Sequence, residues 1–136
     1  MVRPIAYRGP VFTICYAVSR KGDSPGEKFF ETLTMAEKAK SLGLFKRMGD
    51  AGSIVNDEKF GDLGKGLKEF KSFQIRMPCV IRSGQVIISH GFIKKKQKAP
   101  PQEIDRAWRI LEEDESLQAA SQSKPKLQIV KKAGKS

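Results

Sequence analysis

The chain has 136 residues, 39% of them hydrophobic and 30% charged, and its 26 Lys and Arg exceed its 15 Asp and Glu to give a net charge of +11. This length suffices for one domain whose core needs neither disulfides nor metal ions, and no stretch approaches the roughly 20 apolar residues of a membrane helix. Two cysteines and one histidine do not make a zinc-site pattern. Cys15 and Cys79 each lie in an apolar stretch, so we expect both to be buried free thiols in a reducing cytoplasm. We also expect a protein that has no metal, no other cofactor and no membrane partner.

The first half of the chain predicts one strand followed by two helices. Residues 11–18 are β-branched, aromatic or small and apolar at both parities, which is typical of a strand buried on both faces. Residues 24–27 fit a capping box with Ser24 as the N-cap and Pro25 at the first helical position, and residues 34–37 repeat the pattern. Phe, Leu and Met side chains recur at helical spacing after each box, so the sequence predicts a helical hairpin.

The second half predicts strands. Residues 59–66 are Gly-rich and charged, and we interpret them as a loop, because the Lys-Ser/Thr ending of a phosphate-binding loop is missing. Residues 67–81 and 85–93 are predicted strands joined by a tight turn at Ser83-Gly84. Since proline cannot donate a ladder hydrogen bond, Pro78 predicts a bulge, a break or an exposed edge within the first of them.

A helix and a tail complete the chain. Pro100-Pro101 begins a helix whose apolar residues recur at Ile104, Ala107, Trp108 and Leu111. Residues 116–136 contain five basic residues, no acidic residue and no periodicity, which predicts a flexible basic tail after a single domain over residues 1–115. The fold class is therefore α+β in the order β-α-α-β-β-β-α, with an antiparallel sheet that carries its helices on one face and leaves the other face open.

Positive charge is concentrated in residues 65–98, where nine Lys and Arg accompany one acid. A surface of this kind attracts polyanions, although a merely soluble lysine-rich surface would have the same net charge. The basic residues alternate with strand-like apolar residues, which favours a folded face that contacts RNA. Membrane binding is disfavoured, because no basic amphipathic helix is present.

Several side chains in this zone are candidates for chemistry. Arg76 can hold a phosphate through two parallel hydrogen bonds, and Lys71 lies near the start of the same predicted strand pair. The lysines after Phe92 disfavour one another's charge, so one of them could act as a proton donor, or all could form a solvated turn. Glu69 could act as a base or could pair with Lys71 or Lys68.

His90 has two interpretations. Strand alternation places it on one face with Val86, Ile88 and Phe92, where a histidine is either a hydrogen-bonded core residue or a catalyst. With Arg, Lys and a base at hand, the residues suit RNA cleavage in which a 2′-hydroxyl attacks the adjacent phosphate and an acid protonates the 5′-oxygen. The sequence contains no carboxylate cluster of the kind that holds two metal ions in nucleases.

Residues 67–107 carry a motif: an apolar strand, His-Gly-Phe, a lysine run, Gln-Lys-Ala-Pro and then Glu-Ile-Asp-Arg-Ala. With this motif the chain resembles the RelE/HigB-type toxins of type II toxin–antitoxin systems, and more narrowly their phage-derived branch. The resemblance implies a RelE-like fold, an endoribonuclease that cleaves mRNA, in many members on the ribosome, and a cognate antitoxin, often of the helix-turn-helix type. It places the candidate catalytic residues at Glu69, Lys71, Arg76, His90, Lys94 and Lys95. We add the candidate RNA-binding residues Lys68, Arg82, Lys96 and Lys98.

The chain departs from the family pattern in three places, one of which is its long lysine-rich tail. Arg76-Met77-Pro78-Cys79 lacks the usual aromatic residue and inserts Pro78. The only tyrosines are Tyr7 and Tyr16, whereas many relatives stack a base on a tyrosine late in the sheet. The last two departures favour the alternative hypothesis, a non-catalytic phage or plasmid protein of the same fold that binds nucleic acid or a regulator through its basic face.

Overall fold

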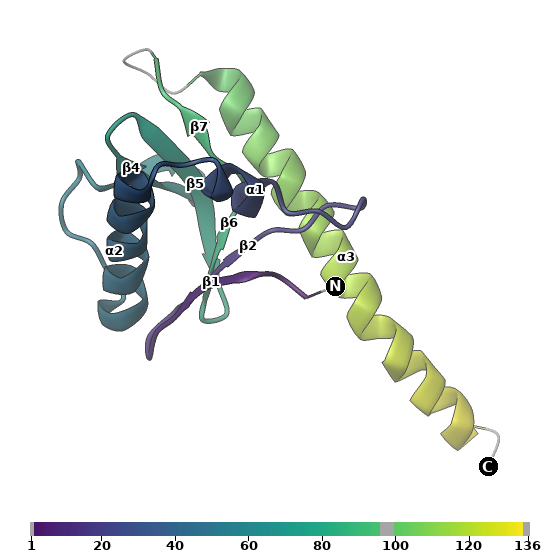
Figure 1. Ribbon diagram of the computed structural model, residues 1–136. Helices are drawn as coiled ribbons and strands as arrows, with labels where there is room; N and C mark the ends of the chain where they lie inside the picture. Colours follow the sequence, from purple (N-terminus) through teal and green to yellow (C-terminus); the bar gives the residue numbers. More distant parts are fainter. Residues whose placement is uncertain (1, 96–99, 135–136) are drawn as a thin grey trace.

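The computed structural model describes residues 2–95 and 100–134, with side chains up to residue 121. A seven-stranded sheet has the strand order β1-β2-β6-β5-β4-β3, and β7 pairs with β5 beyond the end of β6. Three helices accompany it (Figure 1). The strands are β1 (Ile5–Arg8), β2 (Thr13–Tyr16), β3 (Phe60–Gly64), β4 (Leu67–Ser72), β5 (Ile75–Arg82), β6 (Gln85–Ile88) and β7 (Phe92–Ile93), and the helices are α1 (Pro25–Glu31), α2 (Met35–Ala51) and α3 (Pro101–Gly134).

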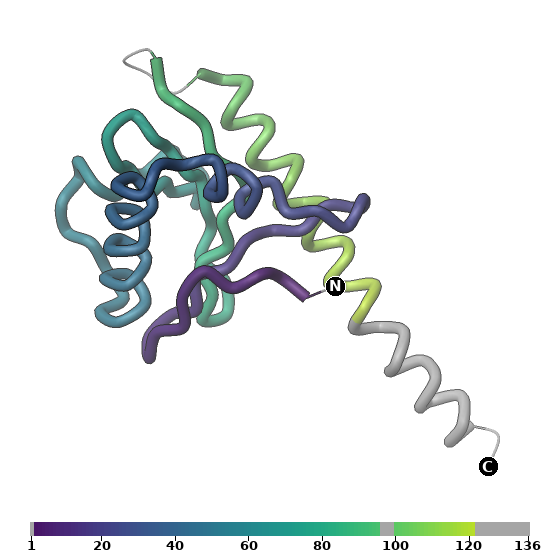
Figure 2. Tube along the Cα trace, viewed as in Figure 1, coloured from purple at the N-terminus to yellow at the C-terminus, as the bar shows by residue number. Residues whose placement is uncertain are grey.

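Helices cover both faces of the sheet, which corrects the prediction of one open face. The larger buried cluster includes Phe45 and Met48 of α2 and Phe70 and Met77 of the sheet. The smaller cluster joins Leu67, Val80 and Ile87 of the sheet to Ala107 and Leu111 of α3 on the opposite face. Figure 2 shows α2 and α3 on opposite sides of the strands. Phe29 and Phe30 of α1 pack against the cluster that contains α2. The prediction was wrong because strands that are apolar at both parities need cover on both sides.

The helical hairpin is confirmed, and one of its two predicted caps is correct. Thr34 accepts a hydrogen bond from the Glu37 backbone while the Glu37 carboxylate accepts one from the Thr34 backbone, and Gly52 ends α2 with a φ of 80°. Ser24 is the N-cap of α1, but its hydroxyl donates to the carbonyl of Ala17 at 2.8 Å rather than capping the helix. The capping box predicted at Ser24 is therefore wrong.

The α+β class is confirmed, whereas the predicted number and order of the strands are not. β1 was not predicted, and β3 replaces the loop expected over residues 59–66. The predicted strand over residues 67–81 is two strands, β4 and β5, which meet at a two-residue turn formed by Phe73 and Gln74. The parallel pairing of β2 with β6 also differs from the expected antiparallel sheet. Both cysteines are free and buried, as predicted.

Pro78 lies in the central strand β5, opposite an irregularity in the neighbouring chain. Cys79 pairs with Ile88 on β6 and Arg76 pairs with Phe92 on β7, so three residues of the connecting chain, 89–91, face two residues of β5. The Pro78 carbonyl accepts from the Ser89 backbone N–H at 2.9 Å. β5 runs unbroken through Pro78 in the interior of the sheet, so the break or exposed edge expected there is wrong. The irregularity lies in the facing chain instead, where it shifts the strand alternation by one residue.

Helix α3 passes residue 115 without a break and extends to Gly134. The sequence contains no helical periodicity in this segment, and we predicted a flexible tail there. Gln118 and Ala119 line a pocket together with residues of β5 and β6, so the folded body includes side chains beyond residue 115. The division into a domain over residues 1–115 and a tail over residues 116–136 stays a prediction.

Candidate functional site

Two basic side chains face each other on the α3 side of the sheet. Lys71 on β4 is the direct partner of Arg76 on β5, and Glu69, two residues before Lys71, has the same orientation. Arg76 is also the partner of Phe92 on β7, and the Lys94 backbone N–H donates to the Gln74 carbonyl at 2.7 Å. The β4–β5 pair and β7 thus bring one carboxylate, Glu69, and three cationic residues, Lys71, Arg76 and Lys94, to the same end of the sheet.

Glu69 is at the centre of this cluster and is only 6% exposed. Burial raises the pKa of its carboxyl group, while the charges of Arg76, Lys71 and Lys94 act in the opposite direction. One buried carboxylate that is within the electrostatic reach of three cations defines a single site, which we call the Glu69 cluster: Glu69, Lys71, Arg76 and Lys94. In the described part of the chain, buried Glu69 Oε1 and Arg76 Nε have no hydrogen-bond partner. Buried polar atoms are usually paired, so these two atoms are candidates for contact with a ligand.

The backbone fixes the guanidinium of Arg76. Its Nη1 donates to the carbonyls of Phe73 and Ile75, both at 2.9 Å. A guanidinium held on one edge loses less rotamer freedom when another edge binds an oxyanion. Arg76 is therefore oriented before any ligand arrives.

Gly61 makes room for the cluster, and sequence reasoning assigned it only to a loop. It is the partner of Glu69 in the β3–β4 pair, and a Cβ at this position would lie 2.9 Å from Lys71 Nζ and 3.7 Å from Glu69 Oε2. A larger residue would displace the lysine. The signal that could have found it is the glycine itself, because an isolated glycine inside a strand often marks close approach by another group.

His90 is a buried connector rather than part of the Glu69 cluster. It is 1% exposed, its Nδ1 lies 2.9 Å from the Ser89 hydroxyl, and its Nε2 lies 2.9 Å from Glu103 in the first turn of α3. Burial lowers the pKa of the imidazole, although the hydrogen bond with Glu103 opposes this shift. Both ring nitrogens are engaged within the protein, and the ring stacks on Phe92 at a centroid distance of 5.8 Å. The predicted shared face with Val86 and Ile88 is wrong, because the irregularity opposite Pro78 intervenes.

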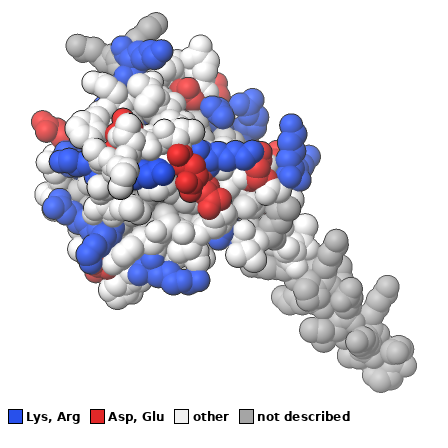
Figure 3. Space-filling model, viewed as in Figure 1, with Lys and Arg blue, Asp and Glu red and all other residues white. Residues whose placement is uncertain are grey.

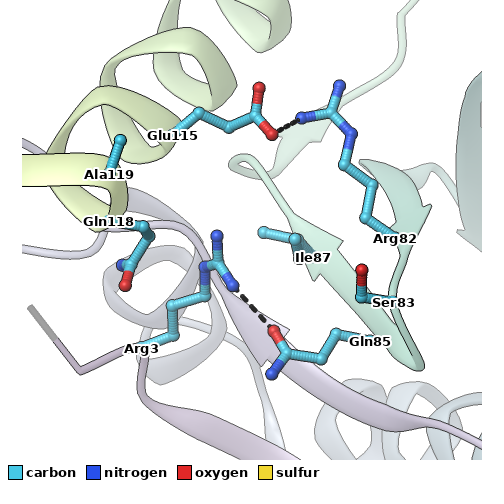
Figure 4. Close-up of a pocket in the computed structure, with 8 residues that line it drawn as sticks. All are labelled: Arg3, Arg82, Ser83, Gln85, Ile87, Glu115, Gln118 and Ala119. Atoms are coloured by element: carbon cyan, nitrogen blue, oxygen red, sulfur yellow. Dashed lines mark hydrogen bonds and ion pairs between the residues drawn. The ribbon is translucent and has the colours of Figure 1, made fainter. Parts of the chain in front are cut away.

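The remaining predicted residues lie apart from the cluster or outside the described residues. Lys68 points to the opposite face of the sheet and pairs with Asp62 at 3.2 Å. Arg82 forms an ion pair with Glu115 of α3 at the far end of β5, beside a pocket of about 390 Å³ (Figure 4). Lys95 is exposed directly after the cluster. Lys96 and Lys98 lie outside the described residues.

Charge on the molecular surface is not confined to the cluster. Figure 3 shows Lys and Arg side chains spread over one face of the molecule rather than collected in a single patch. Among the described residues, no group of three or more His, Cys, Asp and Glu side chains is placed to hold a metal ion. No helix in the described part of the chain has the length and apolar character that crossing a membrane requires.

Comparison with known proteins identifies the family. No curated protein matches the chain. The model of the family described as phage derived protein Gp49-like (DUF891) matches residues 28–112, which is more than half of the chain and includes the whole Glu69 cluster. This agrees with the phage-derived branch that the motif in residues 67–107 indicates. The chain therefore belongs to the Gp49-like family of phage-derived proteins, a RelE-like family associated with toxin–antitoxin systems.

Proposed function

We propose that this protein is an endoribonuclease toxin that cleaves mRNA without a metal ion and that a cognate antitoxin neutralises it. The observation that carries the proposal is the pairing of Lys71 with Arg76 on the same sheet face as the buried carboxylate of Glu69. The charges of both, and that of Lys94, act on this carboxylate. Three cations around one proton acceptor suit a phosphodiester, whose negative charge rises as the attacking oxygen approaches the phosphorus. The association of the family with toxin–antitoxin systems supports the same class.

In the proposed reaction a 2′-hydroxyl attacks the adjacent phosphorus and the bond to the 5′-oxygen breaks. Glu69 accepts the proton of the 2′-hydroxyl, and its raised pKa makes it a stronger base than an exposed carboxylate. Arg76 donates N–H groups to the phosphoryl oxygens, and Lys71 offsets their charge. Lys94 gives a proton to the leaving 5′-oxygen. The products are a 2′,3′-cyclic phosphate and a 5′-hydroxyl, so protons and electrons balance.

In this proposal His90 is a positioning residue. Its two hydrogen bonds join residues 89–91 to the first turn of α3, and its stacking on Phe92 supports the strand that is paired with Arg76. The imidazole thereby orients β7 and the lysine that follows it. No atom of its ring is left to exchange a proton with RNA.

Growth arrest after expression without an antitoxin tests the proposal. The double variant Arg76→Gln/Lys94→Gln should relieve the arrest, because it removes two of the three cations around Glu69. A matched control is Arg20→Gln/Lys21→Gln, which changes the same residue types and the same charge at two exposed residues outside the Glu69 cluster. Equal toxicity of the two double variants would contradict the proposal.

One observation favours the alternative, a non-catalytic binding protein. Tyr7 donates to Asp50 and Tyr16 is buried, and both pack with the core beneath α1 and α2, so neither can stack a base at the Glu69 cluster. Under this alternative the protein binds RNA in a salt-sensitive complex and yields no cleaved product, whether ribosomes are present or absent. Incubating purified protein with labelled mRNA, with and without ribosomes, separates the two functions.

A further inference from the structure

A second basic feature lies on the opposite side of the sheet from the Glu69 cluster. A groove of about 280 Å³ runs between α2 and the end of β4, and we call it the α2 groove. It is lined by Lys40, Gly43, Arg47, Lys59 and Ser72 among others. No acidic side chain lines it, and within the described residues none of its three cations forms an ion pair with a carboxylate. Because no carboxylate offsets their charge, these cations attract a polyanion to the groove.

Gly43 in the wall of the groove lowers the stability of α2, and the packing around it does not explain why glycine is there. It lies in the interior of α2, where glycine is about 1 kcal/mol less favourable than alanine. A Cβ built at this position meets no atom within 4 Å, so no neighbour requires glycine here. What the glycine provides is an open wall, where a ligand can approach the helix backbone between Lys40 and Arg47.

Phe73 at the end of the groove carries a second cost. It follows Ser72 in the β4–β5 turn with a φ of 56°, a region that glycine favours and a bulky side chain rarely adopts. The residue is 61% exposed and its ring centroid lies 5.9 Å from Lys40 Nζ, so Phe73 buries little surface in return for its strained backbone. A two-residue hairpin turn requires a positive φ at this position, and Lys65 and Ser83 have one in the other two hairpins. What the turn does not explain is an exposed phenylalanine where glycine or asparagine is preferred.

Phe73 also connects the two basic features. Its carbonyl accepts from Nη1 of Arg76 in the Glu69 cluster, while its ring lies beside Lys40 in the α2 groove. The turn is the place where the two faces of the sheet meet. A strand that leaves the cluster at this turn would pass over the ring before it reaches the groove.

We propose that the α2 groove binds the phosphates of single-stranded RNA next to the cleavage site and that Phe73 stacks one base between groove and cluster. The proposal rests on the proposed function, because the strand is the same RNA that the Glu69 cluster would cleave. An exposed aromatic ring beside a row of cations is the usual combination for single-strand binding, since every base can stack and every nucleotide carries a phosphate. An acidic polypeptide would satisfy the cations but gives no reason for the exposed ring.

The first experiment measures binding of a 2′-O-methyl RNA of about 12 nucleotides, which lies within the usual length of single-strand sites. This RNA cannot be cleaved by 2′-hydroxyl attack, so binding is measured whether or not the proposed function is correct. The triple variant Lys40→Gln/Arg47→Gln/Lys59→Gln should lower the slope of log affinity against log salt by about two, the value expected for three lost phosphate contacts. The matched control is Arg20→Gln/Lys21→Gln/Lys65→Gln, which makes the same charge change at exposed residues outside the groove. Its slope of log affinity against log salt should stay close to that of the parent.

The second experiment uses Gly43, where larger side chains fit without a clash. Gly43→Glu and Gly43→Lys should each fold at least as stably as the parent, because Glu and Lys both favour a helix more than glycine does. Gly43→Glu should weaken RNA binding at least 10-fold, and Gly43→Lys should bind as tightly as the parent or tighter. Parent-like binding by both variants would overturn the α2 groove as an RNA site. Failure of the proposed function looks different, since unmodified RNA would then stay intact while the groove variants still changed binding.

The third experiment isolates the aromatic ring. Phe73→Gly removes the strain and the ring, so it should bind RNA at least 10-fold more weakly with a melting temperature close to that of the parent. Phe73→Tyr keeps a ring and should restore binding. If Phe73→Gly bound RNA like the parent, or if polyglutamate competed with RNA equally well in parent and Phe73→Gly, the stacking role would be wrong.

Discussion

Lys71 and Arg76 are direct partners across the β4–β5 pair, one step before the turn that joins the two strands. Their side chains therefore share one face, and the charges of both act on Glu69. Like charges in such proximity are unfavourable unless an anion is close, and the Glu69 cluster supplies one carboxylate for three cations. The arrangement suits a phosphodiester that supplies the remaining negative charge.

The first prediction concerns Glu69→Gln, which should raise stability at neutral pH and abolish cleavage. Burial raises the pKa of the carboxyl group in the folded protein, so its contribution to stability is present below the unfolded value near 4.3 and is lost as pH rises through the folded value. Glutamine does not ionise and avoids this loss. Thermal unfolding of parent and variant from about pH 4 to 7 should show a gap that opens as pH rises.

The same variant should lower the cleavage rate by about 10²- to 10⁴-fold, the usual contribution of a general base. A carboxylate that only paired with its lysine neighbours would give the opposite pattern, with lower stability at neutral pH and nearly normal cleavage. Gly61→Ala is the companion variant, because it leaves the carboxylate in place and displaces Lys71.

The second prediction concerns His90→Gln, which should destabilise the fold and leave cleavage per folded molecule within about 10-fold of the parent. Loss of the buried hydrogen bonds should cost about 1–3 kcal/mol at neutral pH, measured by urea unfolding. Burial lowers the pKa of the imidazole, so its contribution is present above the unfolded value near 6.5 and is lost as pH falls through the folded value. The stability gap between parent and variant should therefore narrow on acidification. A catalytic His90 would instead show a loss of rate at least as large as that of Arg76→Gln.

The third prediction concerns Asp114, which ties α3 to the first residues of the chain. It is 1% exposed, accepts from the Arg3 guanidinium at 2.6 Å and accepts from the Val18 backbone N–H at 2.8 Å. Asp114→Asn leaves the Arg3 cation without its partner and should cost about 3–5 kcal/mol in urea unfolding. Glu115→Gln breaks the exposed pair with Arg82 and should cost less than about 1 kcal/mol. Similar costs for the two variants would contradict the account of this buried ion pair.

The fourth prediction concerns the start of α2. Thr34→Ala removes the oxygen that accepts from the Glu37 backbone and should cost about 1 kcal/mol of unfolding free energy. Thr34→Ser keeps the hydroxyl and should stay within about 0.5 kcal/mol of the parent. If both variants lost the same stability, the methyl group of Thr34 rather than its cap would be the source.

The sequence predicts the helical hairpin well, because local signals determine it. The Thr34 capping box, the apolar spacing along α2 and the terminating glycines all act within a few residues. β1 and β3 were missed because both are short and contain residues that disfavour a strand prediction, Arg8 in β1 and two glycines in β3. Their strand conformation depends on pairing with β2 and β4. Cover on both faces could have been predicted from the strands that are apolar at both parities.

Of the candidate site, the sequence identifies the residue types but not how they are grouped. Alternation along β4 already places Glu69 with Lys71, and Lys68 on the other face, once the strand is known to begin at Leu67. Arg76 pairs with Phe92 only because the chain opposite Pro78 is irregular, and a local sequence pattern does not specify that irregularity. For the same reason His90 was wrongly grouped with Val86 and Ile88, whereas its predicted grouping with Phe92 is correct. The α2 groove was not predicted, because its three cations come from two separate segments, α2 and the loop before β3.

The measurement that tests the central claim most directly is the chemistry of the RNA ends produced by the purified protein in the presence of EDTA. Attack by a 2′-hydroxyl at the Glu69 cluster predicts 2′,3′-cyclic phosphate and 5′-hydroxyl ends that are formed by the parent and are absent with Arg76→Gln/Lys94→Gln. Fragments with 3′-hydroxyl and 5′-phosphate ends, or cleavage that persists in the double variant, would contradict the account.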